Sequence, residues 1–540
     1  MTQRNFKIWF MTLPSKYKTL VGSRCIRSVL DDSVAPAGLT VPTRHQKSAF
    51  NILETTAVSV EYFSVIAHNE SVTSTVNYAS QRIVILGAGP GGYEAALVAA
   101  SSNADVTIIE RNALGGSAVL TDVVPSKTLI ATADMMTRFS DAGRLGIENT
   151  KGKAPQLQVD MNRVNSRVLD LAHQQSADIK RALASAGVKI ISGTGKLTGP
   201  HTVAVTDNTG LEYDLHADFI LLSVGTHPRE MATGQPDGER ILTWTQLYNL
   251  REVPRELIVI GSGVTGAEFA SAYNGLGSQV TLISSRDRVL PGEDEDAARV
   301  LEDVFERRGV RVMPRSRASA VERTDDGVVV TLSDGRKVSG THCLVAIGSI
   351  PNTEGLGLET AGVETNESGY VVVDAVSRTS VPHIYAAGDC TGVYPLASVA
   401  AMQGRIAMAH LLGDTVHPLR TDRVAANIFT TPEIATVGIS EKDLAAGVYR
   451  GEAVMLPLTT NPRAKMMAFQ DGFVKIFARK HSGTVIGGVV VGPRASELIY
   501  PIALAIEKKL TVDDLAATFA VYPSLSEAIS TASRQLHTRV

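Results

Sequence analysis

The stretch RIVILGAGPGG, residues 82–92, is followed by the helix-forming run YEAALVAA and by a second apolar run that ends at Glu110. A strand, a glycine-rich turn, a helix and a strand ending in an acidic residue form the unit that binds a dinucleotide. In this unit Gly87 allows the tight turn, Gly89 lets the backbone approach a pyrophosphate, and Gly92 lets the helix pack on the strand. Glu110 is placed to bind a pair of ribose hydroxyls.

The same arrangement occurs a second time. The apolar run LIVI, residues 257–260, leads into GSGVTG, a helix-forming run and the strand VTLIS. Gly261, Gly263 and Gly266 repeat the glycine spacing. One glycine triple is weak evidence, but two copies in full strand–turn–helix–strand context predict two dinucleotides on separate domains.

The second unit differs from the first where its second strand ends. Ser284, followed by Arg286, stands there in place of an acidic residue. A carboxylate would repel a 2′-phosphate, whereas hydroxyls and a guanidinium can bind one. The sequence therefore predicts that NADPH is accepted. NADH stays open, because Ser284 could also bind a 2′-hydroxyl, and Arg286 could equally be an exposed loop residue.

Composition excludes several other classes of function. The 540 residues carry a net charge of −3, which gives no electrostatic reason to expect nucleic acid or anionic lipid as a partner. The apolar runs are strand-length, far short of the ~20 residues of a membrane span. The charged segments REVPREL and RDRVLPGEDED are interpreted as solvated surface. The chain has three scattered cysteines, Cys25, Cys343 and Cys390. They lack metal-ligand spacing and the even pairing of a disulfide framework, so we expect a soluble cytoplasmic enzyme without a metal site.

Residues 1–80 differ from the rest of the chain. Residues 1–30 contain six Lys or Arg and no Asp or Glu. We interpret residues 1–80 as a leader that is a disordered extension, or upstream sequence translated from a wrong start, with Val76 as one candidate start. A basic transit peptide is the alternative.

Further motifs complete a family pattern. They are LLSVGTHP (221–228), LVAIGSIPNTEGLGLE (344–359), IYAAGDC (384–390), and the C-terminal IFTTPEIATVGIS, GFVKIFA and YPSLSEAI. With the two glycine units, the chain resembles the pyridine nucleotide–disulfide oxidoreductases from about residue 82 to about residue 531. The resemblance implies an α/β fold with two Rossmann-like domains and a C-terminal α+β dimerisation domain. We expect an FAD domain at 81–230 and 351–420, an NAD(P) domain at 231–350, and an interface domain at 421–540.

The resemblance also implies roles for individual residues. Lys127 would lie near flavin N5, Glu268 near the nicotinamide, and Asp389 at the ribityl chain. A helix over 395–404 would direct its positive N-terminal end at the flavin. The remaining cofactor-binding residues implied for FAD or NAD(P)H are Gly87, Gly89, Gly92, Glu110, Gly116, Gly195, Ala397, Gly261, Gly263, Gly266, Ser284, Arg286 and Gly348.

Two departures from the family bear on function. The family's GGTCLNVGCIPSK is GGSAVLTDVVPSK here, residues 115–127, so Ala118 and Val123 occupy the cysteine positions. Tyr522 replaces the histidine base of the C-terminal HPTxSE motif, while Glu527 is retained. Thiol–disulfide exchange requires a thiolate and a disulfide, so a sulfur relay and lipoamide dehydrogenase activity are excluded.

An apolar face where the disulfide would stand suits a flat, uncharged acceptor such as a quinone. The chain resembles the cysteine-less actinobacterial NAD(P)H:quinone reductases within the family. We expect a homodimeric FAD enzyme that oxidises NADPH or NADH and reduces a quinone, with Lys127, Glu268, Tyr522 and Glu527 as catalytic candidates. Tyr522 could instead be a packing residue at the subunit contact. The alternative functions are pyridine nucleotide transhydrogenation and a catalytically silent flavoprotein that binds a partner.

Overall fold

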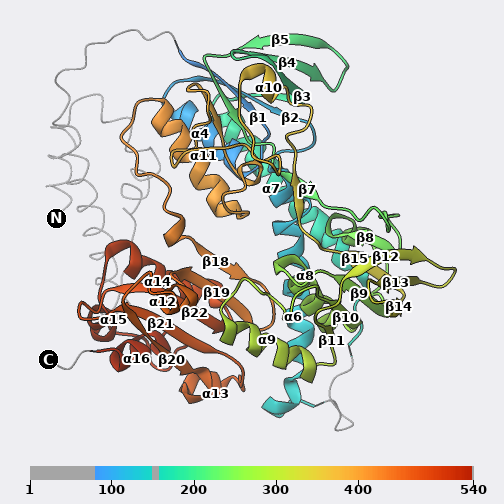
Figure 1. The fold of residues 1–540 in the computed structure, drawn as a ribbon, viewed down its shortest axis with the longest axis vertical. Helices are drawn as coiled ribbons and strands as arrows, with labels where there is room; N and C mark the ends of the chain where they lie inside the picture. The colour runs from blue at the N-terminus through green and yellow to red at the C-terminus, as the bar shows by residue number, and fades with distance from the viewer. Residues whose placement is uncertain (1–79, 149–156, 538–540) are drawn as a thin grey trace, which may run out of the picture. The chain divides into compact units, whose positions relative to one another are not determined.

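The computed structural model describes residues 80–148 and 157–537 (Figure 1). The predicted leader lies outside these residues, apart from Ser80. The first sheet has seven strands in the order β17-β6-β1-β2-β3-β4-β5, with parallel pairing from β17 to β3 and antiparallel pairing from β3 to β5. These strands are β1 (Arg82–Leu86), β2 (Asp105–Glu110), β3 (Lys189–Gly199), β4 (Thr202–Asp207), β5 (Glu212–His216), β6 (Phe219–Leu222) and β17 (Ile384–Ala386).

The central strand β1 explains the continuous apolar run in the sequence. It pairs in parallel with β2 on one side and with β6 on the other, and its residues 83–86 are buried. Strands covered on both faces carry such runs rather than alternating polar residues. Helices α4 (Pro90–Ser101) and α11 (Ala397–Leu411) lie side by side (Figure 1). The contact requires Gly404, because a Cβ there would lie 2.1 Å from the Gly91 carbonyl oxygen.

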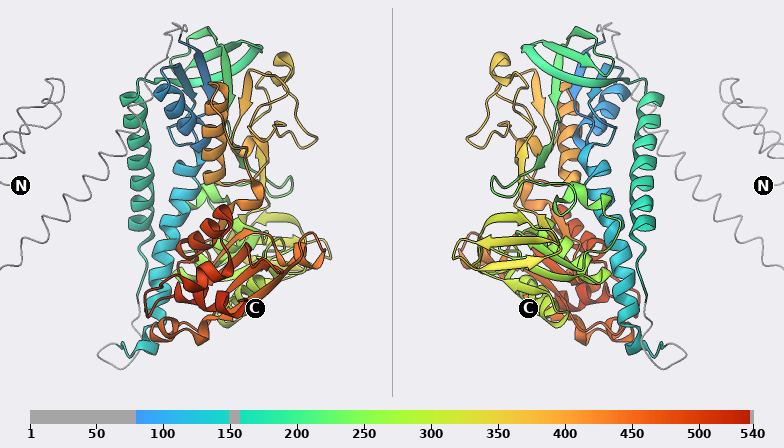
Figure 2. Two further views of the ribbon diagram at one scale, coloured as in Figure 1. Left: turned by 90° about the vertical axis from the view of Figure 1, so that its left-hand side faces the viewer. Right: turned by 90° about the vertical axis from the view of Figure 1, so that its right-hand side faces the viewer.

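Among the described residues, three α-helices and the short helix η3 (Ala142–Leu145) lie between β2 and β3. Helix α5 (Gly116–Leu120) is followed after two residues by α6 (Val123–Ser140), and α7 (Met161–Ser185) packs beside α4, α5 and α6 (Figure 2). The side chain of Asp160 accepts a hydrogen bond from the Arg163 backbone and caps α7. The segment 115–127, which lacks cysteines, therefore forms α5, the short turn and the first turn of α6.

The second glycine unit builds a separate parallel sheet in the order β11-β10-β9-β15-β8. Helices α8 (Val264–Leu276) and α9 (Glu295–Arg307) follow β9 and β10. A three-stranded antiparallel sheet lies in the same stretch of sequence. The strands are β8 (Ile241–Thr243), β9 (Glu256–Ile260), β10 (Gln279–Ile283), β11 (Arg311–Met313), β12 (Ala318–Arg323), β13 (Val328–Leu332), β14 (Lys337–Gly340) and β15 (His342–Val345).

The C-terminal part is an antiparallel sheet in the order β18-β19-β22-β21-β20, with α14 (Ala495–Lys508) packed against β19 and β22. Helices α15 (Val512–Ala517) and α16 (Glu527–Gln535) contact each other. The predicted α/β class with a C-terminal α+β domain is confirmed. The strands are β18 (Ala425–Ile428), β19 (Glu433–Gly438), β20 (Gly451–Pro457), β21 (Phe473–Arg479) and β22 (Val485–Gly492).

None of the helices within residues 80–148 and 157–537 combines the length and hydropathy that a membrane crossing requires.

Candidate active site

In the first glycine turn, Gly87 and Gly92 pack closely against neighbouring backbone, whereas Gly89 faces open space. Gly87 has φ of +93°, and a Cβ there would lie 2.3 Å from the Ser223 carbonyl oxygen. A Cβ on Gly92 would lie 2.0 Å from the Gly87 carbonyl oxygen, so helix and strand could not pack. Gly89, by contrast, has no atom within 4 Å of an added Cβ. The backbone is therefore open at the position where the sequence predicts a pyrophosphate, at the N-terminus of α4.

Glu110 fixes the shape of this turn. Its Oε2 accepts a hydrogen bond from the Ala88 backbone N–H at 2.8 Å, and its Oε1 accepts one from Asn112 at 2.9 Å. Gly116 approaches the same turn, since a Cβ there would lie 2.8 Å from the Gly89 Cα. Gly195 on β3 packs on β1, where a Cβ would lie 2.5 Å from Leu86 Cδ2. These contacts fit the predicted site, although the ligand contacts stay predictions.

The second glycine turn repeats the geometry. A Cβ on Gly261 would lie 2.1 Å from the Ala346 oxygen, and one on Gly266 would lie 1.9 Å from the Gly261 oxygen. Gly263 again faces open space, as does Gly348, whose φ is +99°. Two turns with the same open middle glycine fit two dinucleotides.

The geometry at Ser284 does not fit the predicted contact with the second dinucleotide. Its side chain is fully buried, and its hydroxyl forms a 2.7 Å hydrogen bond with that of Ser262. The hydroxyl also accepts a hydrogen bond from the Arg286 backbone N–H at 3.1 Å. Ser284 therefore shapes the loop from within, because the neighbouring groups already use its hydroxyl. The side chain of Arg286 is exposed and stays the predicted phosphate ligand.

Lys127 and Glu268 lie together although 141 positions separate them. The Lys127 Nζ on α6 donates a hydrogen bond to Glu268 Oε2 on α8 at 2.7 Å. The other carboxylate oxygen of Glu268 accepts the backbone N–H of Phe429 at 2.8 Å, and Lys127 Nζ lies 5.0 Å from the Phe429 ring centroid. The side chain of Glu268 is 4 % exposed. The two residues predicted to flank the reacting rings thus form one charged centre.

Asp389 begins the short helix η5 (Asp389–Thr391), which is separated from β17 by the two buried residues Ala387 and Gly388. Thr226 donates a hydrogen bond to its carboxylate at 3.4 Å. Burial raises the pKa of Asp389 above its ordinary value. The helix predicted over 395–404 is α11, which begins at Ala397.

Two further residues, Asp122 and Tyr248, were not predicted from the sequence. Asp122 is partly buried in the turn between α5 and α6, close to the Lys127–Glu268 pair, and burial raises its pKa to about 6. Tyr248 lies in η4 (Trp244–Asn249), and its buried hydroxyl has no hydrogen-bond partner among the described residues. One signal could have found Asp122: the family motif has glycine where this chain has a carboxylate.

The two cysteines within residues 80–148 and 157–537 give no sulfur relay. Cys343 and Cys390 are both free and fully buried. Burial raises the pKa of Cys390 to about 11, so its thiol stays protonated and unreactive at neutral pH. Ala118 and Val123 are partly exposed apolar residues at the positions where the family has its disulfide.

Tyr522 and Glu527 lie at the C-terminal domain, before and at the start of α16. The side chain of Tyr522 is 70 % exposed, so within one chain it is not a packing residue. One oxygen of Glu527, Oε2, is buried without a hydrogen-bond partner among the described residues. The catalytic roles predicted for both stay predictions.

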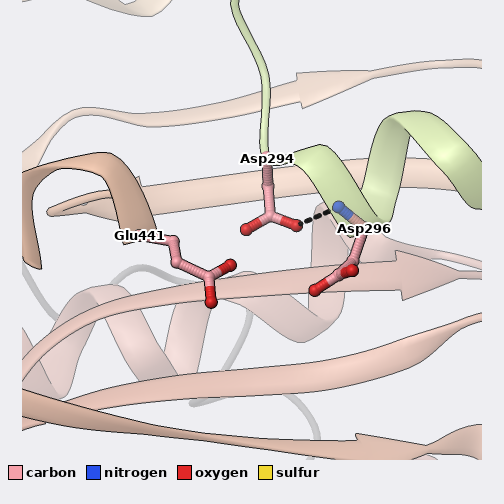
Figure 3. Close-up of side chains that lie close together, drawn as sticks. All are labelled: Asp294, Asp296 and Glu441. Atoms are coloured by element: carbon pink, nitrogen blue, oxygen red, sulfur yellow. Dashed lines mark hydrogen bonds between the residues drawn. The ribbon is translucent and has the colours of Figure 1, made fainter. Parts of the chain in front are cut away.

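The segment RDRVLPGEDED is not simply solvated surface, contrary to the sequence-based interpretation. Asp294, Asp296 and Glu441 bring carboxylate oxygens within 4.8 Å of one another (Figure 3). The Nζ of Lys475 on β21 lies 2.8 Å from Asp294, 2.7 Å from Asp296 and 2.8 Å from Glu441. The side chains of Lys475 and Asp294 are 2 % and 3 % exposed. One ammonium group thus offsets part of the negative charge of this cluster and joins α9 to the C-terminal sheet.

Residues 81–404 match the family model described as pyridine nucleotide-disulphide oxidoreductase, and residues 424–533 match the dimerisation domain of the same family. The chain belongs to this family. Its members are flavoenzymes that use FAD and NAD(P)H. The predicted family, enzyme class and cofactors are therefore confirmed.

The similar proteins carry two different enzyme names. The chain is 53 % identical over 464 residues to a Mycobacterium tuberculosis protein named NAD(P)H dehydrogenase (quinone), covering 84 % of this chain and 94 % of that one. It is 32 % identical to the dihydrolipoyl dehydrogenase of Zymomonas mobilis, covering 83 % and 96 %. The crystal structure of LpdA from Mycobacterium tuberculosis superposes with a TM-score of 0.81 at 52 % identity, covering 85 % of this chain and all of that one.

Proposed function

We propose that this protein is an FAD-dependent NAD(P)H:quinone oxidoreductase without lipoamide dehydrogenase activity. The observation that carries the proposal is the combination of two open glycine turns and an intact Lys127–Glu268 pair with Ala118 and Val123 at the cysteine positions. The name of the 53 % identical relative supports the same acceptor. We also propose that the enzyme is a cytoplasmic homodimer with the domain limits predicted above.

The open side of the turn at Gly89, with Glu110 behind it, would hold FAD, and Asp389 would bind its ribityl hydroxyls. The turn at Gly263 would hold NAD(P)H, with Arg286 at a 2′-phosphate. When bound, FAD supplies a two-electron carrier between the nicotinamide and the acceptor.

The protein itself would contribute to the reaction through the positions and charges of Glu268 and Lys127. Glu268 is held by Lys127 and by the Phe429 backbone N–H, so its carboxylate keeps one orientation. Lys127 presents positive charge to the same region, which stabilises negative charge that develops there. The apolar pair Ala118 and Val123 offers the acceptor a surface without a competing thiol.

The test is steady-state kinetics of the purified, FAD-loaded protein with NADPH and a benzoquinone. We expect quinone turnover with ping-pong kinetics, and no turnover of dihydrolipoamide with NAD⁺. Hydride transfer from NADPH to an NAD⁺ analogue faster than quinone reduction would instead indicate a transhydrogenase. A yellow protein that NADPH does not bleach under anaerobic conditions would indicate a silent flavoprotein.

A further inference from the structure

Asp122 occupies the turn where the family has its second redox cysteine. It is the residue that precedes α6, and its neighbour Val123 stands at the cysteine position. Its backbone is held in place, since its N–H donates to the Ser117 oxygen and its carbonyl oxygen accepts from Ser126, both at 2.8 Å. The backbone of Asp122 is thus fixed next to Val123, on the surface proposed for the acceptor.

The carboxyl group of Asp122 has no evident structural task. Asp, Asn, Ser and Thr before a helix usually accept a hydrogen bond from the first helical turn. The Asp122 side chain makes no such bond, whereas Asp160 does so at α7 and Asp294 at α9. The oxygens of this partly buried carboxyl group therefore remain available to another partner.

The groups around Asp122 come from four different elements. Besides burial, its charge interacts with Lys127 on α6, Glu268 on α8 and Asp389 after β17, and with Tyr248 on η4. Two of these groups, Lys127 and Glu268, are the pair placed at the proposed reaction centre, and Asp389 is the residue proposed for the ribityl chain. Tyr248 adds a buried hydroxyl that has no hydrogen-bond partner among residues 80–148 and 157–537.

Quinone reduction requires a proton that NAD(P)H does not supply. One quinone and one NAD(P)H give one quinol and one NAD(P)⁺ only if a further proton is consumed. NAD(P)H provides a hydride equivalent, which is two electrons and one proton. The second proton must reach a quinone oxygen from an acid.

We propose that the carboxyl group of Asp122 is this acid, an inference that rests on the proposed function. The O–H bond of Asp122 breaks as the O–H bond of the quinol forms, and the carboxylate then regains its proton from solvent. A general acid works best when its pKa lies near the working pH. Burial, opposed by Lys127 and reinforced by Glu268 and Asp389, brings the pKa of Asp122 to about 6.

The test compares Asp122→Asn with the wild type using two acceptors, a benzoquinone and ferricyanide, which takes up electrons without a proton. We expect the ratio of quinone to ferricyanide turnover to fall about 100-fold, the lower end of the usual range for loss of a general acid. Wild-type quinone turnover should decline as the pH rises through about 6, and this dependence should be absent from the variant. Asp122→Glu should recover part of the ratio.

A second measurement does not depend on turnover. Infrared spectra of the FAD-loaded protein should show a carboxylic acid band that titrates near pH 6 and is missing from Asp122→Asn. Asp170→Asn, at an exposed position on α7, is the matched control and should leave both readouts unchanged.

The outcomes separate the two proposals. If the wild type reduces quinone and Asp122→Asn keeps the same ratio of turnovers, or if both acceptors slow equally, Asp122 is not the proton donor. If the wild type reduces ferricyanide but no quinone, the proposed function itself is wrong and the role of Asp122 falls with it.

Discussion

The ammonium group of Lys127 and the carboxylate of Glu268 meet at 2.7 Å and join helices from the two dinucleotide units. The pair is asymmetric, because 27 % of the Lys127 side chain is exposed but only 4 % of Glu268. A buried carboxylate without a cation is costly, whereas a lysine this exposed can find water. The two partners should therefore respond differently to mutation.

Replacing Lys127, the cation that pairs with the buried Glu268, should lower the stability of the protein more than replacing Glu268 itself. Lys127→Met leaves the Glu268 carboxylate with only the Phe429 N–H as partner, and we expect the protein to lose about 2 kcal/mol of stability. Glu268→Gln keeps that hydrogen bond and should cost about 1 kcal/mol or less. Urea unfolding measures both. The exposed pair of Lys189 and Asp105 is the control, and Lys189→Met should cost less than about 0.5 kcal/mol.

The same variants should slow the reaction with NAD(P)H. Both remove charge from the proposed nicotinamide site, so the anaerobic bleaching of flavin absorbance by NADPH should slow about tenfold or more. Bleaching at the wild-type rate in both variants would show that the pair is structural only.

Substitution of the middle glycine of either turn should weaken binding of the ligand at that turn without destabilising the fold. Gly89→Ala and Gly263→Ala place a methyl group in open space, so the apoprotein should unfold at the wild-type urea concentration. Gly89→Ala should be purified with little FAD, while Gly263→Ala should keep FAD and show a KM for NADPH raised about tenfold. Gly92→Ala is the contrasting variant, because its Cβ would meet the Gly87 oxygen at 2.0 Å. It should lose at least about 2 kcal/mol of stability.

Asp122 should also affect the pH dependence of stability. Its folded pKa of about 6 lies above its ordinary value of 3.8, chiefly because of burial. At this site the folded state therefore binds more protons, and the contribution of Asp122 to stability should rise as the pH falls from above 6 toward 4. Asp122→Asn removes this term and should be about 1–2 kcal/mol more stable than the wild type at pH 7.5, with the difference disappearing near pH 4. Urea titrations at both pH values measure it. Equal stabilities at pH 7.5 would mean that the carboxylate is well solvated.

Local patterns predicted the nucleotide units well. Strand β1 has the predicted bounds, and β9 begins one residue before the predicted run 257–260. These elements are encoded by neighbouring residues, since apolar runs and glycine turns depend on a few consecutive positions. The open space at Gly89 and Gly263 follows from the same spacing.

The charged cluster around Lys475 could not be predicted in this way. Lys475 is separated from Asp294 by 181 positions and from Glu441 by 34, and no local pattern reports such a contact. The segment around Asp294 has the composition of a solvated loop, and only the packing of β21 against it buries the charges. The hydrogen bond of Ser284 could not be predicted for a similar reason, since its partner Ser262 lies in the other strand–helix turn of that unit.

A substitution of Tyr522 tests whether this residue takes part in quinone reduction in the proposed dimer. If its exposed hydroxyl donates a hydrogen bond to the quinone across the subunit contact, Tyr522→Phe removes about 1 kcal/mol. Quinone kcat should then fall about fivefold, while flavin bleaching by NADPH is unchanged. Tyr500→Phe, which removes a hydroxyl from a side chain that is 69 % exposed on α14, is the control. Unchanged quinone turnover in Tyr522→Phe would remove Tyr522 from the mechanism.

Lys475 should be essential for stability although it lies outside the proposed active site. Burial lowers the pKa of its ammonium group, but hydrogen bonds to Asp294, Asp296 and Glu441 outweigh burial and raise it above its ordinary value. Its contribution is therefore fully present below that ordinary value and is lost only as the pH rises through the higher folded-state value.

Lys475→Met leaves three neighbouring carboxylates without a cation, and we expect a loss of about 3 kcal/mol at pH 7.5. Carboxylates that repel one another bind protons more readily in the folded state, so the deficit relative to the wild type should shrink as the pH is lowered toward 5. Asp294→Asn in the Lys475→Met background should recover part of the loss, because it removes the most buried negative charge. Lys480→Met, at an exposed position just beyond β21, is the matched control and should leave the unfolding midpoint unchanged. A deficit in Lys475→Met that stays constant with pH would show that lost packing, rather than uncompensated charge, destabilises the variant.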